Sequence, residues 1–166
     1  MDVMVAPRTD RQVASCVEAL REVHLADAYP VRWPADPVDW LTPADALNSW
    51  VAMAGDRVVG HAALRRTDPP TPVAERMGPT LGSPAMVSRL FTVPAARQSG
   101  VARRLLDEVA GWAADHGYEL FLGVADNALG ARRCYERTGW RHVFTEHADW
   151  LDADGRPALV HYYLPG

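Results

Sequence analysis

The segment from residue 85 to residue 125 limits the folds open to this chain more than any other part of the sequence. Apolar runs at 85–93 (AMVSRLFTV) and 119–125 (ELFLGVA) have the composition of buried strands. Between them, residues 99–116 repeat apolar side chains at helical spacing, with charged side chains mostly off that face. A strand, a helix and a second strand in this order predict a right-handed parallel crossover. We therefore expect a mixed α/β fold.

The sequence on either side of this unit predicts more strands and two more helices. One helix follows Thr9 or Asp10, either of which can cap it. The other spans 127–138 and ends at Gly139, a residue type that favours a helix C-terminus. The strands expected outside the central unit, including a hairpin around a Gly-Asp turn and a final pair joined by a turn at 152–155, are 3–6, 49–54, 58–65, 140–147 and 158–164.

Two segments are rich in proline. Residues 27–43 hold Tyr29, Trp33 and Trp40 among four prolines, which predicts an irregular or short-helical aromatic segment. Residues 67–84 carry five prolines and two glycines. We predict a long surface loop there, without a regular element.

Composition narrows the class of protein. A chain of 166 residues with 48% hydrophobic and 23% charged residues fits one globular domain, which we expect to span 1–166. A net charge of -4 argues against a nucleic-acid surface. Because no signal peptide and no apolar run of about 18 residues is present, we expect a cytoplasmic protein without a membrane partner. Two distant cysteines and six scattered histidines predict neither a disulfide framework nor a metal site.

Residues 97–102 (RQSGVA) connect the first strand of the crossover to its helix. Backbone N–H groups at a helix N-terminus lack internal partners, and the helix dipole makes this end positive. Gly100 lets the backbone approach a bulky anion, so the stretch is suited to a phosphate or pyrophosphate. Ordinary strand-to-helix turns use the same residue types, and the Walker and G-x-G-x-x-G patterns are missing here. The residues alone leave both interpretations open.

Two stretches together resemble a known family. LFTVPAARQSGVARRLLDEVAGWA resembles the coenzyme A signature of the GNAT superfamily of N-acetyltransferases, and DNALGARRCYERTGW resembles its second signature, one strand later. The order of elements is similar over nearly the whole chain. The resemblance implies a mostly antiparallel sheet of six to seven strands, with a splayed parallel pair at its centre and about four flanking helices.

The resemblance also implies roles for individual residues. Acetyl-CoA would be the co-substrate, with no metal. Tyr135 would act as the general acid that protonates the leaving thiolate, although a core aromatic would look the same in the sequence. Asn127 would open the second signature, yet it precedes Tyr135 by eight residues where seven is common, so Ala128 is the alternative. The coenzyme A contacts would come from Phe91, Thr92, Val93, Arg97, Gln98, Ser99, Gly100, Val101 and Ala102.

The acceptor side of such a reaction stays open at this stage. A small-molecule or peptide amine would attack directly in a ternary complex, and a homodimer fits the resemblance. The strand at 85–93 holds no carboxylate, which leaves three candidate bases, each with an ordinary structural explanation: His61, Glu119 and Asp126. Four aromatic residues either frame the acceptor or cap the core: Tyr29, Trp33, Trp40 and Trp150. Arg132 and Arg133 either reach the 3′-phosphate or line an exposed face. A non-catalytic acyl-CoA-binding module and a larger acyl donor are the alternative functions.

Overall fold

The computed structural model describes residues 2–79 and 82–166. In chain order the elements are β1 (Met4–Pro7), η1 (Asp10–Gln12), α1 (Val13–Asp27), α2 (Pro37–Leu41), β2 (Ala46–Ala54), β3 (Arg57–Arg65), α3 (Thr71–Met77), β4 (Ser83–Thr92), η2 (Pro94–Ala96), α4 (Val101–Asp115), β5 (Tyr118–Ala125), α5 (Leu129–Arg137), β6 (Arg141–Leu151) and β7 (Pro157–Leu164). The strands form one seven-stranded sheet in the order β1-β2-β3-β4-β5-β7-β6. The mixed α/β class expected from the sequence is confirmed.

Contacts divide the chain into two compact units, which are described separately below. The first contains residues 1–65 and 88–112, and the second contains residues 66–87 and 113–166. β4 and α4 each contribute residues to both units.

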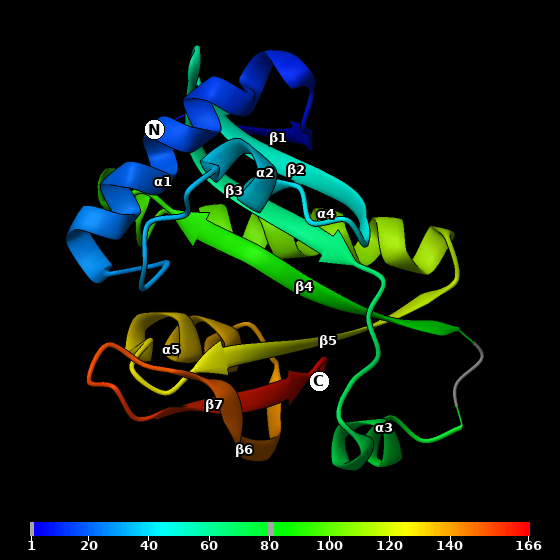
Figure 1. Ribbon diagram of the computed structural model, residues 1–166. Helices are drawn as coiled ribbons and strands as arrows, with labels where there is room; N and C mark the ends of the chain where they lie inside the picture. Colours follow the sequence, from blue (N-terminus) through cyan, green and yellow to red (C-terminus); the bar gives the residue numbers. More distant parts are fainter. Residues whose placement is uncertain (1, 80–81) are drawn as a thin grey trace. The chain divides into compact units, whose positions relative to one another are not determined.

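The first unit is built on antiparallel strands with helices on both faces. β1 pairs with β2 and β2 with β3, so the predicted hairpin around Gly55 is confirmed. α1 and α2 lie on one face of these strands and α4 on the other (Figure 1). α1 contacts β3 and buries four residues at helical spacing: Cys16, Ala19, Leu20 and Val23.

The second unit holds β5, β7 and β6 and the beginning of β4. β7 pairs antiparallel with both β5 and β6. Because side chains alternate along a strand, β7 presents His161 and Tyr163 to one face and Tyr162 and Leu164 to the other. α5 approaches the first of these faces, where Arg132 and Glu136 bond the Tyr163 hydroxyl. Opposite, Leu164 joins a core cluster with residues of α3 and β5.

The parallel crossover predicted from the sequence is confirmed. β4 and β5 are parallel, with Ser83–Val87 paired to Tyr118–Leu122. The paired register ends at Val87, although β4 continues to Thr92. Of the helices in the described part of the chain, none is long and apolar enough to cross a membrane.

The prediction of an irregular loop over residues 67–84 was wrong, because this segment contains α3. Pro72 lies in the first turn of α3, where a missing N–H costs nothing because no helical acceptor exists for it. The helix ends at Gly78, whose φ of 73° suits glycine. Val73 is fully buried and anchors the helix to the core of the second unit.

Candidate functional site

The connection between β4 and α4 forms a cradle of backbone N–H groups. After η2 the chain turns through left-handed conformations at Gln98 (φ 62°) and Gly100 (φ 79°), and α4 begins at Val101. The N–H groups of residues 98–103 make no hydrogen bond to another residue that the structure describes; the next one, of Arg104, donates to the Gly100 carbonyl at 3.0 Å. Six consecutive donors at the positive end of a 15-residue helix can accommodate an anion with several oxygens.

The side chains of this loop mostly stabilise the loop itself. Arg97 forms an ion pair with Asp27 and donates from Nε to the Thr92 carbonyl at 3.2 Å. The Ser99 hydroxyl donates to the carbonyl of Ala96. The Arg97 charge is thus already paired, so the backbone amides are the main donors left for an anion.

The end of β4 offers one residue whose backbone faces away from β3. The Val93 N–H donates to the Val59 carbonyl in β3 at 2.9 Å, and the Val93 carbonyl accepts from the Ala96 N–H at 3.0 Å. Because backbone groups of successive strand residues point to opposite sides, Thr92 presents its N–H on the side away from β3, together with a carbonyl that already accepts from Arg97 Nε. Among Phe91, Thr92 and Val93, Thr92 is therefore the residue best placed for a backbone contact with a ligand.

Gly60 in β3 brings the start of α4 close to the strands, and sequence reasoning missed this. A Cβ atom at Gly60 would lie 3.0 Å from Val101 Cγ1 and 3.1 Å from Leu105 Cδ1. The only sequence signal is a glycine inside an apolar strand, which indicates a close approach by another element. Gly60 thus positions the helix whose N-terminus forms the cradle.

His61 is held in one state by its contacts. The side chain is fully buried and stacks on the Phe91 ring at 5.2 Å. Nδ1 lies 2.9 Å from the Arg89 carbonyl and must donate to it, so Nε2 accepts from Arg8 Nη1 at 2.9 Å. Burial, opposed by the bond to the Arg89 carbonyl and assisted by the charges of Arg8 and Arg89, lowers the pKa of His61 to about 4. No lone pair remains for a substrate amine, which argues against His61 as the base.

The structure brings two of the four predicted acceptor aromatics together. The Tyr29 and Trp40 rings meet edge to face at 6.0 Å, and the Arg89 guanidinium lies 4.2 Å from the Trp40 ring centroid. Trp33 packs instead against Arg21, and Trp150 belongs to the second unit, where it is exposed. Nothing in the sequence indicated that Arg89 would contact Trp40, which lies 49 residues earlier in the aromatic segment.

In the second unit, α5 carries Tyr135 on its buried face. The ring is 6% exposed and lies 6.0 Å from the Tyr163 ring and 6.2 Å from the Trp140 ring. The helix expected over 127–138 begins two residues later, because α5 starts at Leu129 with Ala128 as its N-cap. Asn127 therefore precedes the cap and is exposed.

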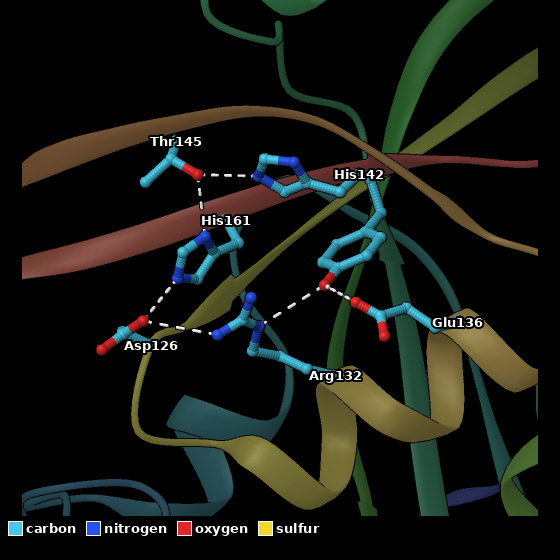
Figure 2. A network of polar contacts seen from close by, with 7 residues as sticks. Asp126, Arg132, Glu136, His142, Thr145 and His161 are labelled. Carbon is cyan, nitrogen blue, oxygen red and sulfur yellow. Dashed lines mark hydrogen bonds and ion pairs between the residues drawn. The ribbon is translucent and has the colours of Figure 1, made fainter.

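A chain of polar contacts crosses β7 to β6 (Figure 2). His161 Nε2 lies 2.6 Å from Asp126 Oδ1, and His161 Nδ1 lies 2.7 Å from Thr145 Oγ1, which in turn lies 2.7 Å from His142 Nε2. A carboxylate oxygen only accepts, so His161 donates from Nε2 to Asp126, and the Thr145 hydroxyl joins His161 Nδ1 to His142 Nε2. Thr145 and His161 are directly opposite in the β6–β7 register, which makes this chain a product of strand pairing.

Arg132, one of the two residues considered for the 3′-phosphate, belongs to the same group (Figure 2). Its guanidinium contacts Asp126 and the Tyr163 hydroxyl, each at 3.4 Å, and Glu136 accepts from that hydroxyl at 2.9 Å. Arg133 is exposed on the same helix. Among residues 2–79 and 82–166, no three His, Cys, Asp or Glu side chains are arranged to hold a metal ion.

Comparison with known proteins agrees with this architecture. Residues 17–140 match the model of the acetyltransferase (GNAT) family. NAA60 of Arabidopsis thaliana in complex with a bisubstrate analogue superposes with a TM-score of 0.76 at 18% identity, covering 98% of this chain and 97% of that one. An N-acetyltransferase from Staphylococcus aureus Mu50 gives a TM-score of 0.74 at 14% identity, with coverage of 98% and 97%.

A third similar structure is the ribosomal-protein-S18-alanine N-acetyltransferase from Escherichia coli, with a TM-score of 0.70 at 14% identity and coverage of 99% and 94%. No curated protein sequence matches the chain significantly. Structural likeness at these identities supports the shared fold, and the family match extends over most of the chain. The chain belongs to the GNAT family of acetyltransferases.

Proposed function

We propose that this chain transfers an acetyl group from acetyl-CoA to a primary amine. The observation that carries the proposal is the row of backbone N–H groups at residues 98–103, which make no hydrogen bond to another described residue. A pyrophosphate supplies several oxygens to such a row and gains from the helix dipole. The structure of Arabidopsis thaliana NAA60 in complex with acetyl-CoA, a neighbour at 19% identity, agrees with this choice of ligand.

The pantetheine arm of coenzyme A carries amides that can pair with a strand edge. The backbone of Thr92 faces away from β3, and the paired register of β4 with β5 has ended five residues earlier, at Val87. We assign the pantetheine contact to this part of β4, with Thr92 as the main backbone partner. The neighbouring Phe91 and Val93 have buried side chains, which anchor this part of the strand to the core.

The reaction needs a free amine and a proton for the thiolate. The amine nitrogen attacks the thioester carbonyl, a C–N bond forms, the C–S bond breaks, and the sulfur leaves with the electron pair. The acetylated nitrogen loses one proton to water, and Tyr135 takes one proton back from water after protonating the sulfur. Tyr135 donates the proton that the sulfur takes up, which contributes about a hundredfold to ten-thousandfold in rate for a well-placed acid. His61 has no free lone pair with which to deprotonate the acceptor, and we propose that the acceptor enters as the free amine.

Ligand-induced stabilisation tests the binding site. Acetyl-CoA should raise the unfolding temperature in a concentration-dependent way. S-acetylpantetheine, which lacks the pyrophosphate, should raise it far less because the amides of residues 98–103 gain nothing. Equal stabilisation by both compounds would refute the cradle, and no stabilisation by acetyl-CoA would refute the proposed function.

The role of Tyr135 is tested by thiol release with a panel of amines. Tyr135→Phe should keep the stabilisation by acetyl-CoA and lower kcat by about a hundredfold or more. Tyr162→Phe is the matched control, since the Tyr162 hydroxyl bonds Glu146 at 3.0 Å on the opposite face of β7. Unchanged turnover in Tyr135→Phe removes Tyr135 from the mechanism. Stabilisation without thiol release for any amine would instead favour a non-catalytic acyl-CoA-binding module.

A further inference from the structure

Three half-buried arginines of the first unit, Arg8, Arg65 and Arg89, have one carboxylate among their ion-pair partners, that of Asp45. Arg65 and Asp45 form a bidentate ion pair, with Nε and Nη2 at 2.7 and 3.1 Å from the two carboxylate oxygens. The charges of Arg65 and Asp45 balance each other, and the bonds from Arg65 hold the pKa of Asp45 below its ordinary value. Asp45 is therefore already committed and is not a full counterion for a second arginine.

Arg89 is the second arginine, and its own contacts are with neutral groups. Nε donates to the Trp40 carbonyl at 3.0 Å, Nη1 donates to Ser88 Oγ at 3.3 Å, and the guanidinium stacks on the Trp40 ring. Nη2 has no hydrogen-bond partner among the described residues. Burial lowers the pKa of Arg89, which reflects the cost of placing this charge away from water.

Arg8 adds a third guanidinium on the other side of His61. It donates to the Leu41 carbonyl, to His61 Nε2 and to the Thr42 hydroxyl, all of them neutral acceptors. Within the described part of the chain, no carboxylate lies within ion-pair distance of Arg8 or Arg89. The charges of both arginines help to lower the pKa of His61, so the histidine between them stays neutral.

The backbone at Arg89 is also unusual. Its φ of 52° lies in the left-handed region, inside a strand and at a residue with a long side chain. Such a conformation costs free energy and persists where surrounding contacts enforce it, often at functional sites. Here the enforced conformation sends the Arg89 carbonyl to His61 and the guanidinium to Trp40. The fold thus holds one guanidinium, which has no ion-pair partner among the described residues, beside the Trp40 and Tyr29 rings at a cost in stability.

We propose that Arg89, flanked by Trp40 and Tyr29, binds a carboxylate carried by the acceptor amine. The acceptor is then an amino acid or a similar small amino acid-like compound. The free Nη2 of Arg89 supplies the main donor, and the Tyr29 hydroxyl, which has no hydrogen bond to another described residue, supplies a second. Arg89 precedes Thr92 by three residues in β4, so the two positions are at most about 10 Å apart along the strand. Polyamines and other cationic acceptors would be repelled. This inference rests on the proposed acetyl transfer.

The test compares each of a set of amino acids with its own amide. L-phenylalanine and L-phenylalaninamide, for example, share the amine and the side chain and differ only in the carboxylate. Thiol release from acetyl-CoA should show kcat/KM at least about tenfold higher for the acids that react best than for their amides, since a bond to a charged group is at stake. Arg89→Gln should bring this ratio close to one, mainly by raising KM for the acid.

Two further variants separate recognition from folding. Arg89→Lys keeps the charge and should retain part of the preference for the acid. Arg57→Gln removes one positive charge from an exposed ion pair with Glu22 in the same unit and should keep the wild-type ratio. Thermal unfolding of each variant, with and without acetyl-CoA, shows whether the fold and the cofactor site are intact.

The outcomes are distinguishable. If acetyl-CoA stabilises the protein but amides react as well as acids, or if Arg89→Gln keeps the wild-type ratio, the inference is overturned and the proposed function stands. Acetyl-CoA stabilisation with thiol release only for polyamines overturns it as well. If acetyl-CoA does not bind at all, both the function and the inference fall.

Discussion

Removing the titration of His61 should change how stability depends on pH. The folded protein holds the pKa of His61 near 4, against an ordinary value of 6.5. Between these two values the unfolded chain binds a proton that the folded chain does not, so stability falls as pH falls. The difference corresponds to about 3 kcal/mol over the whole interval, of which about 2 kcal/mol is lost by pH 5. Because the side chain is fully buried, little of this effect is screened by solvent.

His61→Gln supplies the comparison. The glutamine amide can accept from Arg8 and donate to the Arg89 carbonyl, as the histidine does, but it does not titrate. Urea unfolding at about pH 7.5 and about pH 5 should show that wild type loses about 2 kcal/mol more than the variant. The other five histidines are common to both proteins, so they cancel. Parallel loss of stability in both proteins would refute the assigned state of His61.

Two further pairs of substitutions probe the supports of the cradle and of the polar chain. Gly60→Ala in β3 should destabilise the protein by about 1 kcal/mol or more in urea unfolding, because the new Cβ meets Val101 of α4 at 3.0 Å. Gly111→Ala places a Cβ in open space on α4 and should instead stabilise the protein by about 0.5 to 1 kcal/mol. Thr145→Val should cost about 1 to 3 kcal/mol because it leaves Nδ1 of the buried His161 unpaired, and Thr145→Ser should recover most of the loss. Equal effects in the members of either pair would contradict the contact that it tests.

The sequence predicted those parts of the fold that depend on local pattern. The crossover follows from two apolar strands around an amphipathic helix, and the hairpin follows from a glycine turn between apolar runs, because periodicity and turn chemistry are properties of neighbouring residues. α3 was missed for a related reason. Prolines usually interrupt a helix, whereas Pro72 in the first turn is compatible with one and the buried Val73 holds that helix in place.

In the candidate site too, local features could be predicted from the sequence and contacts between distant residues could not. The turn at residues 97–102 was visible as a loop before a helix, and its left-handed residues Gln98 and Gly100 fit that interpretation. The contacts of His61 were not visible, because its partners Arg8 and Arg89 lie 53 and 28 residues away. Arginine is common on surfaces, so nothing in its local sequence distinguishes one that stacks on a distant tryptophan.

Net charge and local charge act separately in this protein, and that separation makes the arginine variants informative. The chain carries a net charge of -4, yet the row of amides at residues 98–103 and the guanidinium of Arg89 are both suited to anions. Arg89→Gln and Arg57→Gln each take the net charge from -4 to -5, so the two variants are matched in overall charge. A difference between them in the preference for a carboxylate therefore does not come from overall charge, and it depends on where the removed arginine lies.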